Sequence, residues 1–266
     1  MAGSLSDVTV LVSLDKQHVD EFKWCYPTWA KYRPEMLDMP FVVVCDTLLI
    51  GEEEWYDILT PILKRPFVVS PWDNEDMYEP ESTQRENMLT ALVAAATYAV
   101  STKWYLKVDA DTFCCDYSSG WFNPDWLNTN YSYIAPRWGY TKPAQMLYSC
   151  EEWAMEQKHY WGLPEVVPLD SYPENRSRST VKHRRMASWV GYGNTEFTRL
   201  AWGSVVASGV RRLPCPSQDT FLSFMAEKLN WPIKHQNMKK FGWRHGWKRA
   251  KKLINSDWAS FQEFLP

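Results

Sequence analysis

A short apolar segment that ends in two carboxylates one residue apart constrains this chain more than any other part of its sequence. The segment reads KWYLKVDADT over residues 103–112. Its bulky and β-branched side chains favour a buried strand that stops at Asp109 and Asp111. Neighbouring carboxylates raise each other's pKa, and a divalent cation such as Mg²⁺ or Mn²⁺ removes that cost. We therefore predict a metal site at the end of a strand. The alternative is a surface turn with two solvated aspartates.

Three further apolar runs of strand length precede this segment and alternate with helical patterns. The runs cover residues 8–14, 41–45 and 66–70. The helical patterns cover residues 20–32, with a break expected at Pro27, residues 52–63 and residues 84–100. Strands and helices that alternate in this way form a mostly parallel, doubly wound (Rossmann-type) sheet flanked by helices. The predicted fold class is therefore α/β.

The second half of the chain carries weaker local signals. We expect a strand at residues 131–135, a tight turn at Gly191-Tyr-Gly193, and a helix that starts near Pro216 and runs to about residue 229. Residues 163–185 are rich in Pro, Ser and Arg, which indicates a loop over the site. No linker divides the sequence, so a single domain over residues 1–266 is predicted.

Polar or acidic side chains follow each of the predicted parallel strands. Asp15, Asp46 and Ser70 follow the first three strands, and Asp109 and Asp111 follow the fourth. In open α/β sheets, ligands bind at the carboxyl ends of the strands. We therefore expect these side chains to line one ligand site. Their convergence is a more specific signal than the Asp-Ala-Asp segment alone.

Charge is distributed unevenly along the chain, although the formal net charge is only −3. Residues 1–81 contain sixteen Asp and Glu against six Lys and Arg. Residues 176–252 contain seventeen Lys and Arg against three acidic residues, and residues 234–252 contain eight basic residues and no acidic one. This asymmetry indicates a polyanionic ligand that contacts the second half of the chain.

The six cysteines show neither a CxxC pair nor the spacing of a zinc finger. We expect small buried thiols in a reducing compartment. Residues 1–7 lack the basic and apolar regions of a signal peptide, and no apolar stretch reaches the length of a membrane span. We expect a cytoplasmic protein, or one in the host cytoplasm if the chain is viral, unless a membrane-anchored parent was trimmed.

The order of these features resembles the GT-A-fold, DxD-containing, metal-dependent nucleotide-sugar glycosyltransferases. The resemblance covers roughly residues 8–248 and rests on a strand ending at Asp46, a helix carrying Arg85, the Asp109-Ala-Asp111 segment, and a later Gln218-Asp219. Only the Asp-Ala-Asp segment is specific to the family. The resemblance implies a GT-A-like fold in which residues 1–116 bind the nucleotide-sugar and residues 117–266, with their basic tail, bind the acceptor.

The resemblance also implies roles for single residues of the donor site. Asp46 matches the acidic residue that meets the nucleoside, and Arg85 matches a basic residue near the donor. Asp109 would lie toward the ribose or the metal, and Asp111 would be the firmer ligand of Mn²⁺ or Mg²⁺ on the diphosphate. Asp15 joins the donor-binding residues through its place at the end of the first strand.

Three residues near the C-terminus complete the implied site. Asp219 stands where inverting members place the general base; the alternative role is a helix N-cap. His245-Gly-Trp-Lys248 is similar to a C-terminal His-x-x-Gly-x-Lys element, with different spacing. His245 would then be a third metal ligand that favours Mn²⁺ over Mg²⁺, and Lys248 would neutralise the departing diphosphate. The alternative is a solvated basic tail. We expect inversion, because no second nucleophilic carboxylate is evident.

The acceptor is predicted from the basic residues of 176–185 and 234–252, which are interspersed with Trp189, Tyr192, Trp243 and Trp247. This pattern is typical of a groove for a nucleic-acid backbone with stacking platforms, and suggests glycosylation of a flipped, hydroxymethylated base in DNA. Transfer to a glycan, a lipid-linked glycan or a protein is the equal alternative. A UDP-sugar donor is expected on the resemblance alone.

Two other classes of protein fit part of the pattern. A nucleotidyltransferase also uses paired aspartates and Mg²⁺, but residues 13–17, SLDKQ, lack the glycine-rich loop expected after the first strand. A non-catalytic sugar-binding module would explain the sixteen tryptophans, but not carboxylates at the ends of parallel strands. Both rank below a glycosyltransferase.

Overall fold

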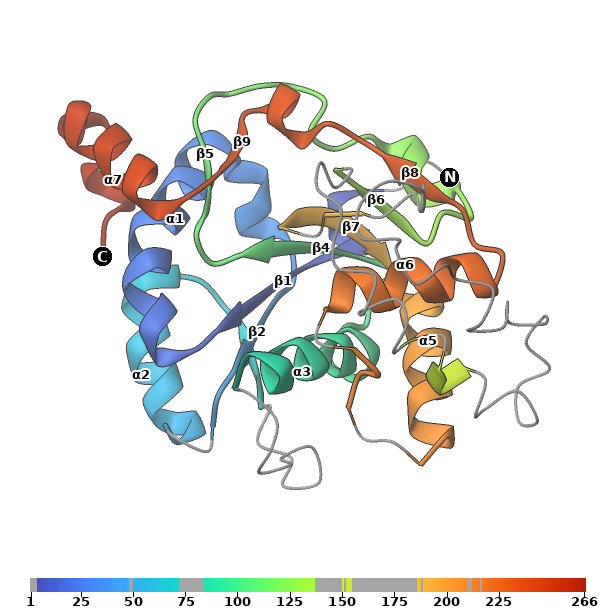
Figure 1. Cartoon of the computed structure of the whole chain (residues 1–266). Helices are drawn as coiled ribbons and strands as arrows, with labels where there is room; N and C mark the ends of the chain where they lie inside the picture. The colour runs from blue at the N-terminus through green and yellow to red at the C-terminus, as the bar shows by residue number, and fades with distance from the viewer. Residues whose placement is uncertain are drawn as a thin grey trace, which may run out of the picture.

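A central sheet organises the molecule. The computed structural model describes residues 4–47, 50–71, 84–136, 150, 152–154, 186–187, 189–209, 212–215 and 217–266, and side chains in the helix at 84–98 are described from residue 88 onward. The strands of the central sheet are β1 (Val8–Leu14), β2 (Phe41–Cys45), β3 (Val68–Pro71), β4 (Trp104–Asp109), β6 (Tyr133–Ala135), β7 (Val190–Asn194) and β8 (Ile233–His235). They form a seven-stranded sheet in the order β3-β2-β1-β4-β7-β6-β8 (Figure 1).

The sheet is mostly parallel, as predicted. β1 lies between β2 and β4 and is parallel to both, so that Val10 pairs with Phe41 on one side and Leu106 on the other. The pairs β2–β3 and β6–β8 are also parallel, whereas β7 runs antiparallel to β4 and β6. A separate two-stranded antiparallel sheet is formed by β5 (Thr112–Cys114) and β9 (Trp243–His245).

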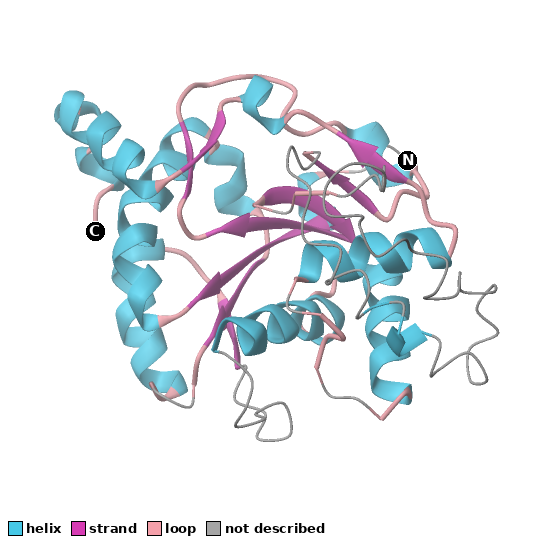
Figure 2. Cartoon of the chain, in the orientation of Figure 1, coloured by secondary structure: helices cyan, strands magenta, loops and turns pink. Residues whose placement is uncertain are grey.

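Helices cover both faces of the sheet (Figure 2). They are α1 (Val19–Tyr32), α2 (Glu52–Leu63), α3 (Gln84–Tyr98), α5 (Thr195–Ala207), α6 (Gln218–Lys228) and α7 (Trp247–Ser256). One apolar core joins α1 and α2 to the sheet side chains that include Val10 and Val12. A second core joins α3, α5 and α6 to the opposite face, which includes Leu11. β1 is buried along its whole length, as a strand covered on both faces must be.

Most predicted elements occur close to their expected bounds, but two local predictions are wrong. The first is the break at Pro27, because α1 is continuous through that residue. A proline inside a helix removes one backbone hydrogen bond and normally bends or breaks the helix. Here Phe22, Tyr26 and Trp29 are buried in the first core, with the Phe22 and Trp29 ring centroids 5.5 Å apart. Burial of three large side chains outweighs the lost bond.

The second wrong prediction is the tight turn at Gly191-Tyr-Gly193, which forms part of β7 instead. The glycines serve close packing and not chain reversal. A Cβ on Gly193 would overlap the Tyr105 ring of β4, and one on Gly191 would lie 2.7 Å from Cβ of Ala135. Glycine in a strand often marks such a close approach.

The basic C-terminal segment is folded over its described course, and six of its eight basic side chains are exposed to solvent. It forms β8, the short 3-10 helix η7 (Met238–Phe241), β9 and α7 in succession. α7 packs beside α1 (Figure 1), and Ala250 and Ile254 are buried. The predicted loop at 163–185 lies outside the described residues. Among the helices that the structure describes, none combines the length and hydropathy needed to cross a bilayer.

Candidate metal and donor site

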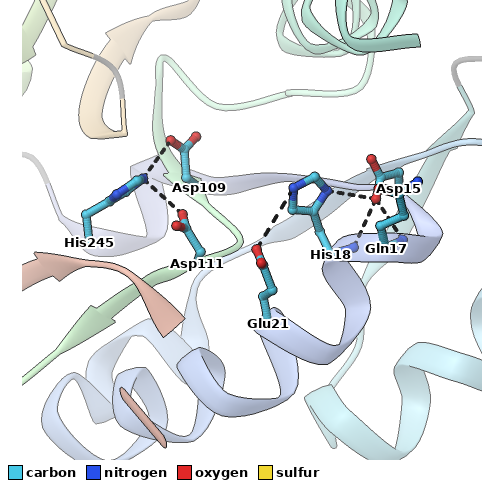
Figure 3. Close-up of polar contacts among 7 residues, drawn as sticks. All are labelled: Asp15, Gln17, His18, Glu21, Asp109, Asp111 and His245. Carbon is cyan, nitrogen blue, oxygen red and sulfur yellow. Dashed lines mark hydrogen bonds and ion pairs between the residues drawn. The ribbon is translucent and has the colours of Figure 1, made fainter. Parts of the chain in front are cut away.

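Three metal-binding side chains meet where β4 ends. The chain leaves β4 at Asp109, passes Asp111, and enters β5, which pairs with β9 so that Thr112 lies opposite His245. The backbone N–H of Gly246 donates to the carbonyl oxygen of Asp111 over 2.8 Å, which ties the two segments together at the site. Figure 3 shows the His245 imidazole directed at both carboxylates. This strand pairing places Thr112 opposite His245, 133 positions later in the sequence.

The geometry of this cluster suits a cation. Nε2 of His245 lies 3.0 Å from Oδ1 of Asp111 and 3.8 Å from Oδ2 of Asp109. One ligand atom from each of the three residues falls within 4.8 Å of the others. Two carboxylates and an imidazole form a donor set that fits a divalent cation such as Mn²⁺. The carboxylates of Asp109 and Asp111 raise the pKa of His245 to about 10, so a cation that binds there displaces a proton.

Lys107 is a site residue that the sequence interpretation missed. It is only 5% exposed, and its Nζ is paired with Oδ1 of Asp109. Burial alone would raise the pKa of Asp109, but the Lys107 ammonium and His245 outweigh it and lower that pKa. Alternation of side chains along a strand places residues 107 and 109 on the same face of β4, which is the signal that could have identified the pair.

A second row of polar side chains approaches the cluster from the start of α1. Oδ1 of Asp15 accepts hydrogen bonds from the backbone N–H groups of Gln17 and His18, at 2.8 and 2.9 Å, and lies 2.7 Å from Nδ1 of His18. Nε2 of His18 in turn lies 3.9 Å from Oε2 of Glu21. Figure 3 shows this row beside Asp111, with Glu21 the nearer member. Asp15 was expected at the site; His18 and Glu21 were not.

Asp15, His18 and Glu21 shift the pKa values of one another or respond to Asp111. The hydrogen bond with Asp15 raises the pKa of His18. Burial works against ionisation of Asp15, but the contacts with His18 outweigh it and lower the pKa of that carboxyl. Burial and the negative charge of Asp111 raise the pKa of Glu21. A carboxylate that senses Asp111 extends the acidic surroundings of the cluster onto α1.

Two tryptophans hold the backbone of the cluster in place. Nε1 of Trp29, in α1, donates to the carbonyl oxygen of Thr112 over 2.6 Å. The backbone N–H of Asp109 donates to the carbonyl oxygen of Trp189 over 2.8 Å, and the Trp189 ring lies 6.0 Å from that of His245. These contacts fix the direction in which the site side chains leave the backbone.

The remaining predicted residues are placed at different parts of the fold. Asp46 directly follows β2 and is 7% exposed, and its carbonyl oxygen accepts a 2.7 Å hydrogen bond from Nε1 of Trp55. Arg85 is the second residue of α3, and its side chain lies outside the described part of the chain. Lys248 is exposed on α7, with Nζ 5.8 Å from the ring of Trp247.

Asp219 is the second residue of α6 and is buried. The N-cap of that helix is Ser217, whose Oγ accepts a 3.3 Å hydrogen bond from the backbone N–H of Thr220. The alternative role of Asp219 as an N-cap is therefore wrong. The three-residue metal cluster does not include Asp219, and its role as a base stays a prediction.

This sheet order and the acidic pair at the end of β4 define the fold class as the GT-A glycosyltransferase fold. The sequence matches no protein-family model and no curated protein. Several solved structures, however, have a similar fold. The galactosyltransferase LgtC, in complex with donor and acceptor sugar analogs, is 10% identical, with a TM-score of 0.54 over 94% of this chain and 96% of that one.

Two mannan-related enzymes are similar to the same extent. Core-mannan synthase A (CmsA/Ktr4) from Aspergillus fumigatus, in a Mn/GDP form, is 12% identical, with a TM-score of 0.54 over 90% of this chain and 74% of that one. The mannosyltransferase Ktr4p from S. cerevisiae is 12% identical, with a TM-score of 0.55 over 90% and 70% of the two chains. At these identities the likeness establishes the fold.

Proposed function

We propose that this protein is a glycosyltransferase that moves a sugar from a nucleotide diphosphate-sugar to an acceptor hydroxyl, with a divalent cation held by Asp109, Asp111 and His245. The observation that carries the proposal is the convergence of these side chains at the carboxyl end of β4 within a GT-A fold. When bound, the cation would neutralise negative charge on the departing diphosphate.

The protein's own groups have separate tasks in this proposal. Lys107 holds one oxygen of Asp109, so the other oxygen stays directed toward His245. Asp15 and Asp46, buried at the ends of β1 and β2, bind the nucleoside. Residues 1–116 thus supply most donor contacts and residues 117–266 the acceptor contacts, with His245 the contribution of the second half to the donor side.

The donor is tested by titration calorimetry of UDP and GDP, first with Mn²⁺ and then with EDTA. UDP is the nucleotide expected from the sequence, and GDP is included because core-mannan synthase A was solved in a Mn/GDP form. We expect one nucleotide to bind in the presence of Mn²⁺ and to lose its affinity in EDTA. Binding that is equally tight in EDTA would contradict the proposed metal site.

Turnover separates an enzyme from a sugar-binding module. Asp111→Asn removes the carboxylate closest to His245 and should lower metal-dependent turnover of the matching nucleotide-sugar by at least about 100-fold. Asp20→Asn, an exposed carboxylate on α1, is the matched control and should leave turnover unchanged. Metal-dependent nucleotide binding by a wild-type protein that turns over no nucleotide-sugar would favour the non-catalytic module.

A glycan is the acceptor that we favour, because Lys234, Arg244 and Lys251 contact aromatic rings or backbone carbonyls of the protein itself. Nζ of Lys234 lies 5.7 Å from the Trp126 ring and 5.6 Å from the Tyr131 ring. Nη1 of Arg244 donates to two backbone carbonyls, and Nζ of Lys251 lies 4.7 Å from the Trp24 ring. LgtC, moreover, was solved with an acceptor sugar analog. A screen of oligosaccharide acceptors tests this assignment.

DNA is the second candidate acceptor, supported by four exposed cations on α7: Lys248, Arg249, Lys251 and Lys252. A phosphate backbone that contacts these residues would be bound less tightly as salt is added. Fluorescence anisotropy with hydroxymethylated DNA over a range of salt concentrations measures this affinity. Replacing the four cations with uncharged residues should make the affinity less dependent on salt. Affinity that is absent at low salt would eliminate the DNA acceptor.

The stereochemical course is decided by NMR of the product anomer. Inversion, expected from the sequence, requires a base on the acceptor side, which is the role proposed for Asp219. In that case Asp219→Asn should lower the turnover number while leaving Mn²⁺-dependent nucleotide binding intact. Retention of configuration would remove the base role from Asp219.

A further inference from the structure

Two cysteine thiols that are 65 positions apart in the sequence meet inside the second core. Sγ of Cys150 lies 3.3 Å from Sγ of Cys215, and the side chains are 0% and 4% exposed. The two sulfurs of a disulfide bond are about 2.0 Å apart, so the Sγ–Sγ distance would have to shorten by on the order of 1 Å. Rotation about a Cα–Cβ bond moves the sulfur of a cysteine over distances of this size.

Contacts that do not involve the sulfur atoms hold both cysteines in place. Cys150 begins a segment in which Trp153 and Ala154 are buried, and Nε1 of Trp153 donates to Oγ of Ser208 over 3.1 Å. The Trp153 ring packs 6.1 Å from that of Phe221 in α6. The meeting of the two thiols is therefore a consequence of tertiary packing.

Cys215 is positioned by the start of α6. Its carbonyl oxygen accepts a 2.8 Å hydrogen bond from the backbone N–H of Ser217, the N-cap of that helix. Its Sγ also lies 3.4 Å from the carbonyl oxygen of Ser217. The thiol is thus anchored to the helix whose second residue is Asp219.

The other four cysteines lack such a pairing among the described contacts. Cys25, Cys45 and Cys114 are buried, and burial raises the pKa of each thiol. Cys115 is partly exposed, and its Sγ lies 3.5 Å from Oδ2 of Asp116. The three buried thiols fit the small buried thiols expected from the sequence.

We propose that Cys150 and Cys215 form a disulfide when the chain folds in the presence of an oxidised thiol, such as glutathione disulfide or a protein disulfide oxidoreductase. One cysteine thiolate attacks the oxidant's S–S bond and releases one reduced thiol. The second cysteine then attacks the mixed disulfide, releases the other reduced thiol, and leaves the Cys150–Cys215 bond. Two cysteine thiols are oxidised and one external disulfide is reduced, so atoms and electrons balance.

This bond would join Cys150 covalently to the segment that leads into α6. Because the proposal does not depend on the cation or on the donor, its failure would leave the proposed glycosyltransferase function unaffected. The closed loop includes β7 and α5, and a loop of this length restricts the unfolded chain strongly. The folded protein should therefore gain stability on oxidation.

The experiment compares full-length protein refolded from the reduced, unfolded state in glutathione redox buffer with the same protein refolded in dithiothreitol. Alkylation followed by peptide mass spectrometry should find four modified cysteines and one peptide pair linked through residues 150 and 215 in the first sample. All six cysteines should be modified in the second. The melting temperature of the oxidised sample should be higher by about 5–10 °C. Six alkylated cysteines after redox refolding, or a linkage between other cysteines, would overturn the proposal.

Two variants test the assignment to this pair. Cys150→Ala and Cys215→Ala should each abolish the linked peptide and the difference in melting temperature between the two buffers. Cys115→Ala, at a partly exposed position, is the matched control and should keep both. If a core variant fails to fold, the wild-type comparison of linked peptide and melting temperature still decides the question.

Discussion

The two halves of the central sheet, the strands from β3 to β4 and the strands from β7 to β8 in the strand order, differ in how their strands pair. On one side, β3, β2, β1 and β4 are all parallel, and each except β3 is buried along almost its whole length. On the other side, β7, β6 and β8 mix parallel with antiparallel pairing, and β6 and β8 have only three residues each. The parallel side follows directly from apolar runs in the sequence. The other side depends on contacts between segments that are distant along the chain.

The metal cluster joins the parallel side of the central sheet to the separate two-stranded sheet. Asp109 and Asp111 leave the parallel side at the end of β4, whereas His245 reaches them from β9 through its pairing with β5. Two of the three ligands can therefore be located from a local pattern, while the third, His245, requires the pairing of two three-residue strands. Four substitutions test how far the site and the fold depend on each of these parts.

The largest effect is expected from His245→Ala. Loss of the imidazole removes the only member of the cluster that comes from the second half of the chain, and should weaken Mn²⁺ binding by about 100-fold in calorimetric titration. Lys240→Ala, exposed in the neighbouring η7, is the control for lost positive charge and should bind Mn²⁺ normally. Unchanged affinity in His245→Ala would mean that the parallel side holds the cation alone.

Gly193→Ala tests how β7 joins the parallel side. The added Cβ would overlap the Tyr105 ring, so the free energy of unfolding should fall by about 1–3 kcal/mol in urea denaturation. Gly203, inside α5, has no neighbour within 4 Å of an added Cβ. Gly203→Ala should therefore leave stability unchanged or raise it by up to about 1 kcal/mol, because alanine is the better helix former. Equal effects of the two variants would contradict the close approach of β7 to β4.

Lys107→Met concerns a contact made entirely within the parallel side. The methionine retains most of the buried volume but leaves Asp109 without its ammonium partner. The pKa of Asp109 should rise, and Mn²⁺ affinity should fall by about 10-fold. The exposed Lys103 precedes the same strand, and Lys103→Met should leave the affinity unchanged. An affinity equal to that of wild type would show that the Lys107 pair does not orient the Asp109 carboxylate.

The smallest effect is expected from Asp15→Asn, at the end of β1. The pKa of His18 should fall toward its ordinary value in an NMR titration, because the partner carboxylate that raises it is gone. The sign for stability follows from the direction of the shift. A raised His18 pKa stabilises the fold below the ordinary histidine pKa of 6.5, and this contribution disappears as the pH rises through the raised value. Asp15→Asn should therefore reduce the dependence of stability on pH in that window, and an unshifted His18 resonance would contradict the pairing.

The local sequence predicted much of the parallel side. Strands buried on both faces require continuous apolar runs, and β1 and β2 occupy the expected residues. The positions of Asp15, Asp46 and Asp109 follow because a parallel sheet collects its strand ends at one edge. Helix bounds were close, since apolar spacing and caps are local signals.

The fold class and the acidic edge of the sheet could thus be predicted from the sequence, because both follow from the pattern of neighbouring residues. The family resemblance offered His245 as a third metal ligand, and the folded chain places it against Asp111 through a strand pairing that no local pattern predicts. The meeting of Cys150 with Cys215 had no counterpart in the sequence analysis. The same holds for glycines that pack β7 against β4 instead of turning the chain, and for Pro27 inside α1. Such contacts are decided by the free energy of burying many side chains from all parts of the chain. A short stretch of sequence does not include those side chains, so it cannot predict the contacts.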